Sequence, residues 1–123
     1  MTNINRLVLA GRLTRDPEVR FTSTGTALMK VGVAVNERRK NASGEWVEDA
    51  IFCDVLMFGK RAEAFANYHC KGSECCFPDA KLAYDTWEDK VTGEGRNRLY
   101  VIANTWEFIG AKPEPPVDTG IPF

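Results

Sequence analysis

The sequence predicts an all-β domain, a small barrel of five strands with one helix. In several segments apolar residues recur at every second position, as they do in strands with one buried face. Only residues 60–70 place apolar side chains at helical spacing, and polar, glycine-containing stretches separate the segments. With 123 residues, 44% of them hydrophobic, the chain is long enough for one domain with a modest core.

The expected elements follow this alternation along the chain. Strands are predicted at residues 4–13, 27–36, 51–58, 74–82 and 98–109, with a short additional strand at 18–22. The helix at 60–70 is followed by Lys71-Gly72, a cation and a glycine that indicate its end. Within 74–82 the apolar positions change parity at Pro78, whose ring nitrogen cannot donate to a ladder, so a β-bulge is expected at Pro78-Asp79.

Two long polar connections complete this pattern. Residues 37–47 read as a long hairpin loop and residues 84–97 as a second polar loop, with Tyr84 and Trp87 near its base. Five strands with a helix after the third, and long loops after the second and fourth, are typical of the OB-fold. We therefore expect an OB-fold domain at residues 1–110 and a flexible tail at 111–123, where the composition becomes proline-rich.

The strand at 51–58 carries apolar side chains on both faces. Ile51, Cys53, Val55 and Met57 share one face, and Phe52 and Phe58 lie on the other. A barrel strand needs only one apolar face for its core. The two phenylalanines are therefore either covered by a helix or a second subunit, or exposed as a platform on which nucleobases stack.

Charge is distributed unevenly along a chain whose net charge is −1. Residues 1–40 hold eight basic and three acidic side chains, whereas residues 41–109 hold seven basic and twelve acidic ones. This asymmetry permits a basic surface on an acidic protein, although a charged face is by default a solvated one.

Enzymatic, metal-binding and membrane functions find no support in the residues. The four cysteines contain no C-x-x-C pair and His69 is the only histidine, so neither a metal site nor a cofactor is expected. No phosphate loop or nucleophile elbow is present, which argues against an enzyme. No apolar run is long enough for a bilayer and no signal pattern opens the chain, so we expect a cytoplasmic protein.

Several motifs resemble the bacterial single-stranded DNA-binding proteins, a family that phages and plasmids also encode. The most specific is Asn5-Arg6-Leu7-Val8-Leu9-Ala10-Gly11-Arg12-Leu13-Thr14-Arg15-Asp16-Pro17-Glu18-Val19-Arg20-Phe21-Thr22. The stretch from Phe52 to Lys60, the pairs Ala62-Glu63 and Lys71-Gly72, and the terminal Ile121-Pro122-Phe123 also match.

The resemblance implies a nucleoid-associated homotetramer that wraps single-stranded DNA in replication, recombination and repair. By motif position Phe52, Phe58 and Trp87 are its stacking aromatics. The side chains expected to assist them on the DNA are Arg12, Arg15, Arg20, Arg38, Arg39, Lys60, Arg61 and Tyr84. The tip, with Asp118, Ile121, Pro122 and Phe123, is expected to recruit replication and repair proteins, the terminal carboxylate and Phe123 entering a partner's pocket.

Departures from the family pattern predict weaker binding. Arg38-Arg39 stands where the family often has an aromatic, Ala83 and Asp85 replace basic residues, and Asp54 shares a face with Phe52. A primosome-type accessory protein of the same fold is the rival interpretation, and the terminal Ile121-Pro122-Phe123 argues against it.

Overall fold

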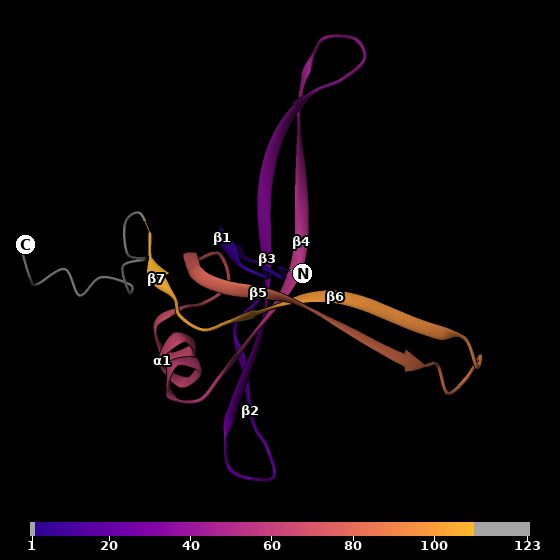
Figure 1. The fold of residues 1–123 in the computed structure, drawn as a ribbon. Coiled ribbons are helices and arrows are strands. Elements are labelled where there is room, and N and C mark those ends of the chain that lie inside the picture. The colour runs from indigo at the N-terminus through magenta and orange to yellow at the C-terminus, as the bar shows by residue number, and fades with distance from the viewer. Residues whose placement is uncertain (1, 110–123) are drawn as a thin grey trace, which may run out of the picture.

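The computed structural model describes residues 2–109 and has an all-β fold with one helix, as the sequence predicts (Figure 1). The elements in chain order are β1 (Leu7–Leu13), β2 (Glu18–Phe21), β3 (Ala27–Lys40), β4 (Trp46–Phe58), α1 (Lys60–Tyr68), β5 (Glu74–Glu88), β6 (Gly95–Ala103) and β7 (Glu107–Phe108). The five long strands pair in the order β1-β3-β4-β6-β5, and β5 pairs again with β1. This second pairing closes the sheet into the expected five-stranded OB-fold barrel.

The barrel interior is filled by side chains that alternate along β3 and β4. Met29, Val31 and Val33 of β3 and Val55 and Met57 of β4 are almost completely buried. Phe65 of α1 and Phe77 of β5 pack into the same core. Cys75 is also buried there, and this burial raises the pKa of its thiol to about 12, as suits an inert core residue.

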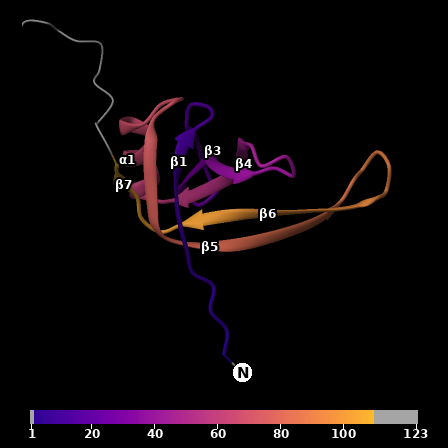
Figure 2. The same ribbon diagram turned by 90° about the horizontal axis from the view of Figure 1, so that it is seen from above.

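Two strand pairs extend beyond the barrel as twisted ribbons. β3 and β4 stay paired from Leu28–Phe58 out to Lys40–Trp46, and β5 and β6 out to Glu88–Gly95. Figure 1 shows the β3–β4 ribbon rising above the barrel, and Figure 2 shows the β5–β6 ribbon projecting to one side.

The long loops expected at 37–47 and 84–97 are therefore wrong in extent. The first connection is a short turn, in which Asn41 Oδ1 accepts hydrogen bonds from the backbone N–H groups of Ser43 and Glu45, each at 2.9 Å. The second is the turn at 89–94, closed by the Asp89 N–H donating to the Glu94 carbonyl at 2.8 Å. A polar segment can remain a strand when both faces meet solvent, because its backbone groups are still satisfied across the ladder.

The predicted bulge is confirmed. Leu7 pairs with Ala80 and Leu9 with Phe77, so Pro78 and Asp79 together lie opposite Val8. The predicted strand at 98–109 is interrupted, because β6 ends at Ala103 and only the short β7 follows. Just beyond β6, the Asn104 N–H donates to the Asp79 carbonyl of β5 at 2.9 Å.

Candidate nucleic-acid interface

One face of the β3–β4 pair carries exposed aromatic rings. Directly paired residues of antiparallel strands point to the same side, and the pairs Ala34–Phe52, Leu28–Phe58 and Lys40–Trp46 alternate with the core residues. We call this side, opposite the core, the outer face. Phe52 is 70% exposed and Phe58 47%, so both side chains are open to solvent, Phe58 for about half of its surface.

The outer face continues onto the strands on both sides of β3–β4. Arg20 of β2 pairs with Leu28, which is the partner of Phe58. Arg12 of β1 pairs with Ala34, which is the partner of Phe52. Both arginines therefore lie on the same face as the two phenylalanines. On the other side lies β6, whose Arg98 contacts Asp54 of β4. The predicted site residues Phe52, Phe58, Arg12 and Arg20 are thus gathered on one surface.

Asp54 lies between the two phenylalanines on β4 and is surrounded by cations. Arg15 Nη2 donates to its Oδ1 at 3.3 Å, Arg98 Nη1 to its Oδ2 at 3.5 Å, and Lys30 Nζ lies 4.0 Å from Oδ2. A Cβ at Gly32 would overlap Thr14 Oγ1 and lie 2.9 Å from Arg15 Nη1, so the glycine permits Arg15 to lie across β3. Asp54 is therefore the shared counter-ion of three cations, not the isolated acid that its position in the sequence suggests.

Other cations around the outer face are also paired within the chain. Arg12 contacts Glu74 at 2.8 Å and Arg20 contacts Glu18 at 3.0 Å. All four side chains are largely exposed, and such pairs contribute about 0–1 kcal/mol each. Exposed pairs of this kind are weak enough for an incoming polyanion to compete with the carboxylates.

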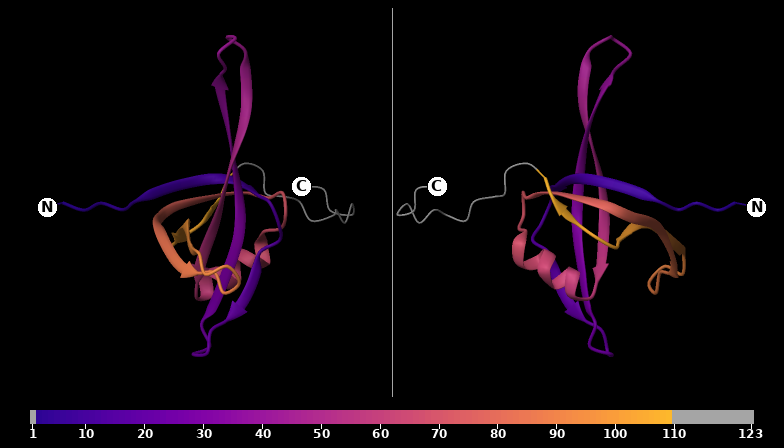
Figure 3. Two further views of the ribbon diagram at one scale, coloured as in Figure 1. Left: turned by 90° about the vertical axis from the view of Figure 1, so that its right-hand side faces the viewer. Right: turned by 60° about the vertical axis from the view of Figure 1, so that its left-hand side comes forward.

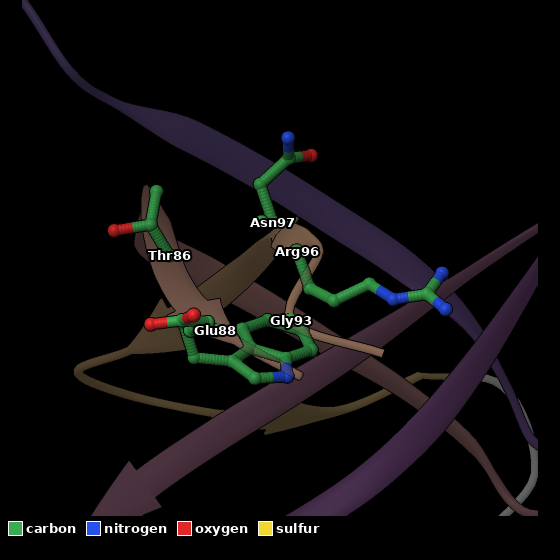
Figure 4. Close-up of a pocket in the computed structure, with 7 residues that line it drawn as sticks. Thr86, Glu88, Gly93, Arg96 and Asn97 are labelled. Carbon is green, nitrogen blue, oxygen red and sulfur yellow. The ribbon is translucent and has the colours of Figure 1, made fainter. Parts of the chain in front are cut away.

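Trp87 lies at the end of the β5–β6 ribbon, where its partner across the ladder is Arg96. Figure 4 shows a shallow cleft in this region, in which Glu88 and Arg96 extend in opposite directions. The residues that line it are Thr86, Trp87, Glu88, Gly93, Gly95, Arg96 and Asn97. The indole is 48% exposed. Asp85 pairs with Arg98 on the same side of the ribbon as Trp87, so this aromatic joins the outer face through Arg98.

Tyr100 contacts both Arg98 and Asp85, where the β5–β6 ribbon meets the outer face. Its hydroxyl donates to Asp85 Oδ1 at 3.2 Å, and the Arg98 guanidinium lies 5.3 Å from its ring centre. Desolvation, together with the Asp85 carboxylate, raises the pKa of Tyr100, which keeps the phenol protonated and donating. Asp85 therefore has two partners on this face, the Tyr100 hydroxyl and the Arg98 guanidinium.

Several predicted site residues lie away from the outer face. Arg39 points to the opposite side of the β3–β4 ribbon and pairs with Asp49. Tyr84 lies opposite Leu99 on the other side of the β5–β6 ribbon from Trp87. Lys60 is exposed at the start of α1, and Arg61 donates to the Asn104 carbonyl at 2.9 Å. Asp118, Ile121, Pro122 and Phe123 lie outside the described residues.

The structure adds outer-face residues that the sequence reasoning did not select: Lys30, Lys40, Trp46, Arg96 and Arg98. Trp46 is 61% exposed. It lies an even number of positions before Phe52 on β4, so the two side chains are on the same face of the strand. The sequence does not show this position, because the segment 37–47 reads as a loop, to which strand parity does not apply.

Among residues 2–109 no three His, Cys, Asp or Glu side chains are grouped as a metal ion would require. No helix in that range has the length and apolar character needed to span a bilayer.

Fold and face together define the class: an OB-fold barrel that presents aromatic rings and cations on one open sheet face. Residues 4–109 match the Single-strand binding protein family, and the chain belongs to that family. Its members are binding proteins and not enzymes.

Similar proteins carry the same description. The chain is 35% identical over 111 residues to the single-stranded DNA-binding protein of Treponema pallidum, covering 90% of this chain and 61% of that protein. It is 34% identical to the one from Borreliella burgdorferi, covering 90% and 73%. A deletion mutant of the single-stranded DNA binding protein from Thermus aquaticus superposes with a TM-score of 0.76 and 26% identity, covering 89% of this chain and 52% of that chain. The chain thus spans less than two thirds of the Treponema protein.

Proposed function

We propose that this chain binds single-stranded DNA on its outer face, largely without sequence preference. The observation that carries the proposal is the pair of exposed rings, Phe52 and Phe58, on one sheet face. Arg12, Arg20 and the cations around Asp54 flank these rings. Unpaired bases expose a π-face that duplex DNA buries, so such rings select single strands, whatever the base. The relatives named as single-stranded DNA-binding proteins support the same conclusion.

Binding on this face exchanges ion pairs. A phosphate that approaches Arg12, Arg15 or Arg20 replaces Glu74, Asp54 or Glu18 as the counter-ion. Breaking an exposed ion pair costs little free energy, but this cost offsets part of the binding free energy gained from each phosphate contact. We therefore propose affinity below that of a face whose cations are unpaired.

The proposed function includes self-association. Exposed apolar side chains away from the β3–β4 pair include Ile4, Val8, Leu82, Tyr84 and Leu99, all between 48% and 82% exposed. Leu7 and Leu9 of β1 pack against their own core. Val8 therefore faces outward from β1, and we propose a closed oligomer, a homotetramer by resemblance, that covers this apolar surface.

The proposed cellular role rests on the family to which the chain belongs. We propose that the protein protects single strands during replication, recombination and repair, in the cytoplasm and at the nucleoid. Its terminal Ile121-Pro122-Phe123 is proposed to recruit partner proteins, with Phe123 contributing more than charge. Deleting Phe123 should leave single-strand affinity unchanged while ending capture of replication or repair proteins from a lysate of the source cell. Equal capture by both proteins would contradict this role of the tip.

The test of the central proposal is a titration of a fluorescently labelled homopolymeric oligonucleotide, repeated with duplex DNA. The wild type should bind the single strand strongly in preference to the duplex. Phe52→Ala and Trp87→Ala should each weaken single-strand binding by about 1–3 kcal/mol without changing fold stability. Phe21→Ala is a matched control, because Phe21 is 64% exposed but pairs with the buried Ala27 and so points away from the outer face. Equal affinity for duplex and single strand would refute the proposal.

A further inference from the structure

The distal end of the β3–β4 ribbon carries an aromatic residue that the family resemblance does not select. Trp46 pairs with Lys40 across the ladder, and both lie on the side of the ribbon that holds Phe52 and Phe58. Figure 3 shows this ribbon standing clear of the barrel, so its end is far from the core. The indole is 61% exposed although it belongs to the largest apolar side-chain type.

Two cations accompany this indole. The Arg38 guanidinium lies 5.5 Å from the ring centre and the Lys40 ammonium 5.7 Å from it. Both cations are on the outer face of β3. A ring next to two positive charges presents the combination that single-strand binders use, a stacking surface together with phosphate partners.

A purely structural role is the alternative. Two-stranded ribbons are marginally stable by themselves, and the cross-strand contact between Trp46 and Lys40 stabilises the pairing. Arg39 and Asp49 already form such a contact on the opposite side of the ribbon. The two roles predict different results for short and long oligonucleotides. Only a stacking role requires the bound DNA strand to be long enough to reach Trp46.

We propose that Trp46, with Arg38 and Lys40, forms a separate stacking site for a nucleobase of the single strand bound at Phe52 and Phe58. This inference rests on the proposed function and extends it to the ribbon end. Phe52 lies six positions after Trp46 along β4, which corresponds to about 20 Å. The whole path from Phe58 to Trp46 is about 40 Å. A short oligonucleotide seated on both phenylalanines does not span this path, whereas a long one does.

The experiment compares oligonucleotides of about 6 and about 20 thymidines. Trp46→Thr removes the ring but keeps a residue that favours strands, and Phe21→Thr makes the same kind of change at an equally exposed ring off the outer face. Trp46→Thr should weaken binding of the long oligonucleotide by about 5-fold to 100-fold and leave the short one unchanged. Phe21→Thr should change neither, and Trp46→Phe should restore most of the lost affinity.

Fluorescence supplies a direct readout of contact. In a Trp87→Phe background, Trp46 is the more exposed of the remaining tryptophans, since Trp106 is half-buried and donates Nε1–H to the Arg61 carbonyl. The long oligonucleotide should quench this emission, and the short one should not.

These experiments test the Trp46 site separately from the proposed DNA binding at Phe52 and Phe58. Equal losses at both lengths after Trp46→Thr, or no loss at either, would overturn the Trp46 site while leaving binding at Phe52 intact. A Phe52→Ala protein that binds both oligonucleotides like the wild type would refute the proposed function itself.

Discussion

Replacing Asp54 with asparagine removes one negative charge from the centre of the outer face. The carboxylate contacts Arg15, Lys30 and Arg98 at 3.3, 4.0 and 3.5 Å. Asparagine has nearly the same shape, so the change releases these cations from their shared counter-ion without opening a cavity. The cations are 36–46% exposed, so solvent screens the pairs, and the cost to folding stability is about 1 kcal/mol.

The gain for binding follows from counter-ion release. One additional phosphate contact makes the slope of log affinity against log salt steeper by about 0.7 for a single strand. At about 0.1 M salt this corresponds to roughly fivefold tighter binding, and the difference vanishes near 1 M. Asp54→Asn should therefore bind single-stranded DNA about fivefold more tightly at low salt.

The assay is fluorescence anisotropy of a labelled oligonucleotide over a series of salt concentrations. Asp49→Asn is the matched control, because it removes the same charge from the opposite side of the ribbon, where Asp49 pairs with Arg39. Its slope should equal that of the wild type. Weaker binding by Asp54→Asn with an unchanged or shallower slope would refute the reasoning, because it would mean that the carboxylate holds Arg15 and Arg98 in place for phosphate.

Three further predictions concern charge, pH and assembly. Arg38→Ala should flatten the salt dependence of binding more than Arg39→Ala, because only Arg38 lies on the outer face; equal effects in the same anisotropy assay would contradict this assignment. Burial lowers the pKa of His69, whose Nε2 is buried without a hydrogen-bond partner among residues 2–109, so the folded state favours the neutral ring. Urea unfolding should show stability falling as pH drops below about 6.5, and His69→Phe should flatten this trend, whereas an unchanged pH dependence in His69→Phe would contradict the assignment to His69. Val8→Asp should shift the light-scattering mass toward the monomer, and a wild type that is monomeric at micromolar concentration would contradict the proposed oligomer.

Much of the barrel is determined locally by the sequence. The alternation in β3 and β4 predicts correctly which side chains enter the core, because a strand's side chains alternate strictly between its two faces. The bulge was equally predictable, since the missing N–H of Pro78 and the parity change are properties of the chain itself. The same parity placed Phe52 and Phe58 on one face and left open whether anything covers them.

Tertiary structure alone decided the length of the ribbons and the electrostatics of the outer face. Residues 37–40 are polar on both sides, and residues 46–50 mix apolar and acidic side chains without alternation, so no pattern marks them as strands. Only pairing across the ladder reveals that Arg38 and Arg39 face opposite ways. The partners of Asp54 include Arg15 and Arg98, which are 39 and 44 residues away in the sequence. They meet because barrel closure brings the β1–β2 connection and β6 to the two sides of β3–β4, and register over such separations is set by the packed fold and not by local sequence.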